Sequence, residues 1–388
     1  MKAFKQFVAL LQLSLSGLRY RLSTVLVTII GAAGVVGVLI SMLSMGTGTR
    51  AMVMQNARAD RAWILSHGAQ GNFDSNLPKN AVPIIEDMPG IKKDADGKAL
   101  AYAAAIVDVE GRKKFDNSRV NLDLIGVGDM FRAVHPEFHL TAGRLFQPGV
   151  RELIAGKSRH ELLKNFEIGD HVRLRGNDWT VVGHFEAGGF FDNSLMGDAP
   201  TVMSAFGNSS FNSVTAMLES PAAFDQLQAA LKANPSVDVE VRREIDLMRE
   251  QSKQLSKVMD FVSYFVGATM AIGATLGAIN AMYAIVDGRK REIATLRAIG
   301  FGVWPVILAV LTEALILVLP GAAVGALAAW FLFNGNVISP GGMSITLLVT
   351  PGLVALGIGW ALAMGLIGGL LPAVRAASVS VTTALRAI

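Results

Sequence analysis

The sequence contains no cysteine, so disulfide bonds and thiolate metal sites are excluded. A second absence is local: residues 314–374 run for 61 positions without a single Asp, Glu, Lys or Arg. A soluble folded protein spreads charged side chains over its surface. So long an uncharged, apolar stretch therefore points to lipid as its solvent.

Signals for catalysis are also missing. The sequence has no phosphate-binding loop of the GxxxxGK[ST] form, so we expect no ATP site of that type on this chain. His135 and His139 are four residues apart, but Pro136 between them argues against a metal-binding helix face. We predict no catalytic residue, no bound cofactor and no metal, and we expect that this chain by itself is not an enzyme.

What the sequence does contain is long hydrophobic segments. Hydrophobic residues make up 52% of the chain, which favours an integral membrane protein. About 20 apolar residues in a helix cross the roughly 30 Å of bilayer hydrocarbon. Four segments reach that length, and we predict spans at residues 21–48, 261–286, 304–333 and 345–374.

The charged residues are concentrated in one region. Residues 50–260 hold 25 basic and 28 acidic side chains, and ten basic residues lie outside this region. With the N-terminus in the cytoplasm and four spans, all ten fall on cytoplasmic segments, which is the positive-inside pattern. The pattern places both termini in the cytoplasm and the charged region outside it. Because the basic residues flank spans, we expect no nucleic-acid partner.

The remaining segments complete the predicted organisation. They are an amphipathic cytoplasmic helix at 1–20, an external domain at 49–241, a stalk helix at 242–260, a cytoplasmic segment at 287–303, a short external loop at 334–344 and a cytoplasmic tail at 375–388. The stalk contains no Pro or Gly and runs directly into the second span. Its apolar residues line one face and include Ile245, Met248, Leu255 and Met259.

The external domain alternates between strand and helix patterns, which predicts an α+β or mixed fold. Strands are expected at 122–127, 171–174, 179–185, 213–219 and 237–241, with a helix at 221–233. Residues 175–178, with the sequence Arg-Gly-Asn-Asp, are expected to form the turn between the second and third of these strands.

Small and ionisable residues stand out within the spans. Pairs of glycines four residues apart allow helices to approach closely, and they are Gly273 and Gly277, Gly321 and Gly325, and Gly365 and Gly369. Glu313 is the only acidic residue within a predicted span. An ionisable residue there is a candidate functional site, although we favour a structural role because a single carboxylate makes no proton relay.

The sharpest local signal lies between the second and third spans, at residues 289–300. As a helix this segment places Ile293, Leu296 and Ile299 at three-residue steps, and Gly300 is suited to end it. Such a ridge could enter a groove of a partner protein. The residues that we assign to this contact are Arg289, Arg291, Glu292, Ile293, Leu296, Arg297, Ile299 and Gly300. From the residues alone, a basic cytoplasmic loop without a partner is the open alternative.

Two short runs in this segment, Arg291-Glu292-Ile293 and Leu296-Arg297-Ala298-Ile299-Gly300, closely resemble the coupling helix of MacB/FtsX-like ABC transporter permeases. The order of elements along the whole chain is similar to that family. Further resembling runs lie at residues 371–377 and 384–386 near the C-terminus and at 143–146, 168–172 and 179–183 in the external domain.

The resemblance implies a function as the permease subunit of an ABC transporter in the bacterial inner membrane, with a periplasmic domain. It implies two copies of a separate cytoplasmic ABC ATPase, which bind ATP and Mg²⁺, and a second permease chain. A homodimer is favoured and a heterodimer is left open, as is a periplasmic adaptor protein. ATP hydrolysis would drive export or extraction of a substrate by mechanotransmission to the periplasmic domain. The alternatives are an FtsX-like regulator of cell-wall enzymes and a lipoprotein-releasing permease.

Overall fold

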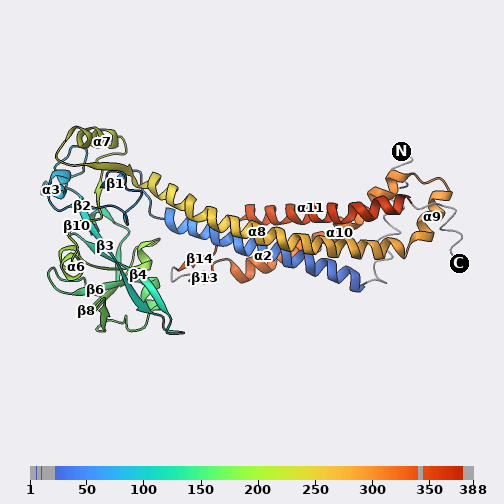
Figure 1. Ribbon diagram of the computed structural model, residues 1–388, viewed down its shortest axis with the longest axis horizontal. Coiled ribbons are helices and arrows are strands. Elements are labelled where there is room, and N and C mark those ends of the chain that lie inside the picture. Colours follow the sequence, from blue (N-terminus) through green and yellow to red (C-terminus); the bar gives the residue numbers. More distant parts are fainter. Residues whose placement is uncertain (1–5, 7–9, 11–21, 340–343, 379–388) are drawn as a thin grey trace. The chain divides into compact units, whose positions relative to one another are not determined.

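The computed structural model of the protein describes residues 6, 10, 22–339 and 344–378 (Figure 1). The amphipathic helix predicted at 1–20 and most of the predicted tail therefore lie outside the described residues. The chain divides into two compact units. Unit 1 consists of Met1–Gly48, Ser256–Asn336 and Thr346–Ile388, and unit 2 consists of Thr49–Leu255 and Val337–Ile345.

Four long helices carry the hydrophobic segments. They are α2 (Leu22–Met54), α8 (Glu244–Asp287), α10 (Val303–Phe333) and α11 (Pro351–Ser378). Each is long and apolar enough to cross a membrane, and no further helix of this kind occurs among the described residues. The short helix α9 (Lys290–Ala298) connects α8 to α10. The prediction of four membrane-spanning helices is confirmed.

The ends of these helices differ from the predicted bounds. Helix α11 begins at Pro351, later than expected, because proline suits a first helical turn and Ile345–Thr346 instead forms strand β14, which pairs with β13 (Val337–Ile338). Helix α8 begins at Glu244 because the two preceding residues belong to a strand. Helix α2 extends past the predicted span to Met54.

Glycines set the distance between helices in unit 1. A Cβ on Gly325 of α10 would lie 2.3 Å from the carbonyl oxygen of Ala33 in α2, so only glycine permits this approach. Gly321 likewise contacts α2, and Gly365 and Gly369 of α11 contact α10. The contact expected at Gly273 and Gly277 is not made within the described chain, where added Cβ atoms would meet nothing within 4 Å.

Unit 2 is built around a mixed sheet of ten strands. Their order is β12-β1-β11-β3-β4-β9-β6-β8-β5, with β7 paired to β8. The strands are β1 (Arg61–Ser66), β3 (Ala101–Arg112), β4 (Arg119–Val127), β5 (His139–Gly143), β6 (Glu152–Gly156), β7 (His171–Leu174), β8 (Asn177–Glu186), β9 (Ser194–Asp198), β11 (Ser213–Met217) and β12 (Val239–Arg243). The β4–β9 and β6–β8 pairs are parallel and the other pairs are antiparallel.

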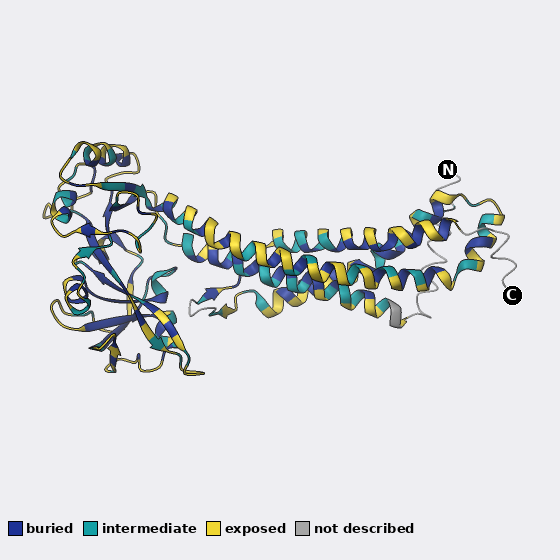
Figure 2. Cartoon of the chain, in the orientation of Figure 1, coloured by how far each residue is buried: buried dark blue, intermediate teal, exposed yellow. Residues whose placement is uncertain are grey.

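Short helices cover this sheet. They are α3 (Ala81–Glu86), α4 (Phe131–Val134), α5 (Lys157–Leu162), the 3-10 helix η2 (Phe191–Asn193), α6 (Ala199–Phe206) and α7 (Ala223–Ala233), and a small separate sheet pairs β2 (Leu77–Pro78) with β10 (Ser210–Phe211). Most residues of the central strands are buried (Figure 2). The predicted combination of α+β domain and membrane helices is confirmed.

One hairpin of unit 2 follows directly from the sequence. Strands β7 and β8 pair with Leu174 opposite Asn177, which leaves Arg175 and Gly176 as a two-residue loop. Both residues have positive φ, 44° and 87°. A two-residue turn of this handedness matches the right-handed twist of the flanking strands. The predicted turn is confirmed, and it is shorter than the four residues expected.

Candidate functional site

Helix α9 ends in a well-defined motif. The amide of Phe301 donates to the carbonyl of Leu296 at 3.1 Å, and the amide of Gly300 donates to Arg297 at 3.0 Å. This pair of hydrogen bonds closes a helix when the residue after its end is left-handed, and Gly300 has φ of +103°. The motif fixes the direction in which the chain leaves α9 toward α10.

One face of α9 is buried in unit 1. Ile293 and Ala294 are 6% and 0% exposed, and Leu296 is partly buried. The apolar cluster that receives them includes Met282 and Ile285 of α8 together with residues of α10 and α11. Helix α9 is therefore packed against the ends of three long helices.

Polar contacts attach α9 and its flanks to the same helices. Arg289 lies 3.1 Å from the carboxylate of Glu292 and 3.6 Å from that of Glu313 on α10. Arg297 donates a 2.5 Å hydrogen bond from Nη1 to the carbonyl of Ala377 on α11. Glu313 thus has a cationic neighbour, and the structural role favoured from the sequence remains our expectation.

The burial pattern changes the interpretation of the predicted apolar ridge. Ile293 and Leu296 pack within unit 1, whereas Ile299 is 72% exposed. The ridge therefore does not lie on one free face. The exposed surface that a partner could contact consists of Arg291, Glu292, Thr295 and Ala298 of α9 and of Ile299, which directly follows the helix.

The stalk segment forms the first turns of α8, but a different face is buried from the one predicted. Leu255 is 44% exposed, and Ile245, Met248 and Met259 are only partly buried. The buried positions are Glu244, Leu247, Ser252 and Ser256. Small serine side chains let another backbone approach, and Ser256 Oγ donates to the carbonyl of Gly46 in α2 at 3.5 Å. Sequence patterning based on hydrophobicity missed this polar face.

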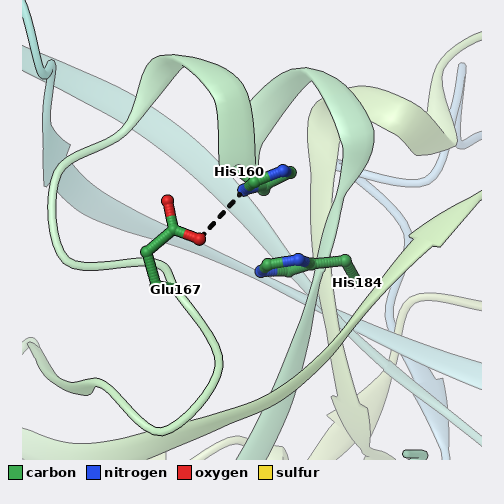
Figure 3. Close-up of side chains that lie close together, drawn as sticks. All are labelled: His160, Glu167 and His184. Carbon is green, nitrogen blue, oxygen red and sulfur yellow. Dashed lines mark ion pairs between the residues drawn. The ribbon is translucent and has the colours of Figure 1, made fainter. Parts of the chain in front are cut away.

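Three side chains of unit 2 form a cluster that the sequence did not indicate: His160, Glu167 and His184 (Figure 3). Each offers one potential ligand atom, and these atoms lie within 4.8 Å of one another. The two imidazole rings stack with their centroids 3.9 Å apart and their planes 15° apart. Burial and the neighbouring His184 lower the pKa of His160, which favours its neutral form.

The geometry of this cluster does not suit a metal ion. An imidazole binds a metal through a lone pair in the ring plane, and two nearly parallel stacked rings direct their lone pairs side by side. His184 also donates from Nε2 to the carbonyl of Phe166 at 2.9 Å. Lys114 lies 2.8 Å from the carboxylate of Glu167 and neutralises it. The prediction that the chain binds no metal therefore remains our expectation.

Comparison with known families gives two matches. Residues 24–234 match the MacB-like periplasmic core domain, and residues 264–381 match the FtsX-like permease C-terminal domain. Together these two regions contain α9, every strand of the unit 2 sheet except β12, and most of the long helices.

Similar proteins include ATP-binding/permease proteins and a protein named only as a permease. The macrolide export ATP-binding/permease protein MacB of Brucella melitensis is 24% identical over 96% of this chain and 60% of its own length. MacB of Neisseria gonorrhoeae is 24% identical over 98% of this chain and 61% of its own length. The uncharacterized ABC transporter permease YknZ of Bacillus subtilis is 24% identical over 96% of this chain and 99% of its own length. The chain thus spans about three fifths of the length of these MacB relatives.

Solved structures are similar only in part. The periplasmic region of MacB from Actinobacillus actinomycetemcomitans covers 52% of this chain at 16% identity, with 95% of that structure matched and a TM-score of 0.39. The extracellular domain of the transporter YknZ covers 47% of this chain at 15% identity, with 99% of that structure matched and a TM-score of 0.36.

Proposed function

Because the chain belongs to the family of MacB/FtsX-type ABC transporter permeases, we propose that it transmits the work of an ABC ATPase to unit 2. In this proposal two ATPase subunits bind ATP and Mg²⁺ and contact the exposed face of α9. Two permease chains form a dimer in the inner membrane, with α9 in the cytoplasm and unit 2 in the periplasm. A periplasmic adaptor would be a further partner.

The attachment of α9 is the observation that carries this proposal. Ile293 and Leu296 seat the helix in the apolar cluster formed by α8, α10 and α11, and Arg289 and Arg297 bind α10 and α11. A push on α9 is thereby delivered to the long helices instead of being absorbed by a loose loop.

Helix α8 offers a route away from that attachment. It is continuous over 44 residues from Glu244 to Asp287 and contains residues of both units. A helix without an internal proline or break resists compression and bending, so displacement of one end reaches the other. We propose that unit 2 responds to this displacement and acts on a substrate, in export or extraction from the periplasmic side.

Association with the ATPase tests the proposal. Arg291→Glu changes an exposed position of α9 and Ile299→Asp changes the exposed residue that directly follows it, and each should reduce copurification of the coexpressed ABC ATPase at least fivefold. Lys257→Glu, an exposed charge reversal on α8, is the matched control and should leave copurification unchanged. Normal copurification of the ATPase with both α9 variants would refute the assigned contact.

ATP turnover gives a second test. We expect the purified chain to show no hydrolysis alone and the reconstituted complex to hydrolyse ATP. Turnover that follows this polypeptide through purification in the absence of an ATPase subunit would contradict the assignment of ATP binding to a partner.

A further inference from the structure

A fully buried arginine lies where unit 2 begins. Arg61 is the first residue of β1, and its side chain is 0% exposed. The strand pairs on one side with β12, where Ala62 is opposite Arg243, so Arg61 is close to the start of α8 at Glu244. Every contact described below lies within unit 2.

The guanidinium of Arg61 bridges three parts of the chain. Its Nε donates to Glu244 at 2.7 Å, and Nη1 donates to Glu137 at 2.7 Å. Nη1 also contacts Nδ1 of His135 at 2.7 Å and the carbonyl of Val134 at 3.3 Å. Nη2 donates to the carbonyl of Asn56, just after the end of α2. Its donor groups are thus directed to segments that are far apart in the sequence.

His135 contributes both ring nitrogens to this arrangement. Its Nδ1 lies 2.7 Å from Nη1 of Arg61 and 3.0 Å from Oε1 of Glu137. Its Nε2 lies 2.9 Å from the hydroxyl oxygen of Tyr102. Burial lowers the pKa of His135 to about 4, so the ring is neutral at pH 7 and fits between Arg61 and Tyr102.

The first turn of α8 is held from a second direction. Glu244 accepts a hydrogen bond from the backbone amide of Arg58 at 2.9 Å, and the amide of Ile245 donates to the carbonyl of Arg58 at 3.3 Å. The segment after α2 is itself fixed, because Asn56 Nδ2 donates to Ala187 at 2.5 Å and Gln55 accepts from Gly189 at 2.9 Å. The end of α2 and the start of α8 are therefore bound to each other and to the core.

Stability by itself does not explain the buried charged network around Arg61. Burying charges removes them from water, and apolar residues of similar volume often stabilise a fold equally well. A buried arginine with several acceptors fixes the relative orientation of the segments that it joins, because each N–H must point at its acceptor. Loss of Arg61 would release the orientation of the α8 start, even where the fold survives.

We propose that Arg61 is a positioning residue that locks the first turn of α8 and the segment after α2 to the sheet of unit 2, so that these parts move as one body. This inference rests on the proposed function, in which displacement along α8 must reach unit 2. Without the lock, the first turn of α8 would rotate relative to the sheet. The displacement carried along α8 would then not be transmitted to unit 2.

The absence of cysteine allows a direct test on the full chain with its ATPase. Spin labels at K253C on α8 and K232C on α7, both exposed, report the distance between α8 and the unit 2 core. Dilution with unlabelled chain restricts the signal to one protomer. We expect a narrow distance distribution in the parent protein and one at least twice as broad in Arg61→Met.

Two further variants separate positioning from stability. The double variant Arg61→Met with Glu244→Gln removes the charges of both residues. We expect its unfolding temperature to recover relative to Arg61→Met alone, while its spin-label distance distribution stays broad. Arg61→Lys keeps the positive charge but loses the planar set of guanidinium N–H donors. We expect its distance distribution to have an intermediate width. A narrow distribution in the folded double variant, or a broad one in the parent protein, would overturn the proposal.

Single labels distinguish this inference from the proposed function. In a dimer, K253C alone and K232C alone report distances between the two chains, and both should change on ATP addition. In Arg61→Met we expect the K253C change to persist and the K232C change to be lost. If ATP changes the K253C and K232C distances in Arg61→Met as much as in the parent protein, the lock is refuted. No change at either position in the parent protein would refute the relay, while the width of the distribution still decides the lock.

Discussion

Nη1 of Arg289 lies 3.6 Å from Oε2 of Glu313, and the Glu313 side chain is only 2% exposed. Arg289 marks the corner between α8 and α9, whereas Glu313 belongs to α10. The ion pair therefore joins the connection between two long helices to a third. A carboxylate inside an apolar helix is costly unless it is paired, and this contact accounts for its presence.

Removing Glu313 should loosen α9. Taking away one partner of a buried pair costs about 3 kcal/mol, and Arg289 would keep its ion pair with the exposed Glu292. We expect Glu313→Ala to accelerate hydrogen exchange of the α9 amides at least tenfold in the full chain. Glu292→Gln removes the exposed partner of the same arginine and should have little effect. Equal exchange in both variants would show that the Arg289–Glu313 pair does not hold α9.

The end of α9 should depend on a left-handed residue. Gly300 has φ of +103°, and a side chain with a Cβ is strained there by about 1–2 kcal/mol. We expect Gly300→Ala to reduce ATPase copurification and Gly300→Asn to reduce it less, because asparagine tolerates positive φ. Identical behaviour of the two variants would argue against the helix-ending motif.

Two glycines of the spans should respond in opposite ways to alanine. Gly325→Ala would place Cβ 2.3 Å from a backbone oxygen of α2, and forcing the helices apart costs about 2 kcal/mol. Gly273→Ala meets nothing within 4 Å in the described chain, and alanine favours helix by about 1 kcal/mol. The thermal unfolding temperature in detergent should therefore fall for Gly325→Ala and stay the same or rise for Gly273→Ala.

Unit 2 should lose stability as pH rises from about 4 through about 6. Asp123 on β4 lies opposite Asp108 on β3, and burial followed by repulsion from Asp108 raises the pKa of Asp123 to about 6. The folded state thus binds this proton more tightly than the unfolded state, whose aspartate titrates near 4. The stabilising contribution is complete below the unfolded value and is lost as pH rises through about 6.

Asp123→Asn removes this penalty. We expect the free energy of unfolding of the variant to exceed that of the parent protein by about 1–2 kcal/mol at pH 7.5. At pH 4 we expect it not to exceed that of the parent. Unfolding midpoints of the full chain at the two pH values give the measurement, with exposed Glu219→Gln as the control. A constant difference between variant and parent at both values would show that Asp123 is not the titrating group.

The stacked histidines lead to a prediction about metal. Because the rings of His160 and His184 are nearly parallel and Lys114 binds Glu167, we expect zinc to leave the unfolding temperature within 1 °C or so of its value with chelator. Isothermal titration with Zn²⁺ should show no saturable heat. Stoichiometric binding that His160→Ala abolishes would instead identify a metal site.

Sequence patterns predicted the parts of the fold that depend on local physics. Long apolar segments gave the four spans, and alternation with a Gly-containing turn gave the β7–β8 hairpin. Strand β3 was missed because its run Ala103-Ala104-Ala105 has weak strand preference, and burial between neighbouring strands decides its conformation.

The candidate site was predictable in outline but not in its contacts. The helix at 290–298 and its terminal Gly300 follow from local rules. Which of its apolar residues face inward depends on where α8, α10 and α11 end, and periodicity does not contain that information. Arg61 gave no signal either, since one arginine before an apolar strand is common and its partners lie up to 183 positions away.

The pairing of β1 with β12 has an architectural consequence. The first and last strands of the ten-stranded sheet in chain order are adjacent and antiparallel, with Ala62 opposite Arg243. An insertion with neighbouring ends can be exchanged for another without stretching the segments that flank it. We therefore expect a hybrid permease that carries a different insert between α2 and α8 to fold if the Arg61 and Glu244 positions are kept.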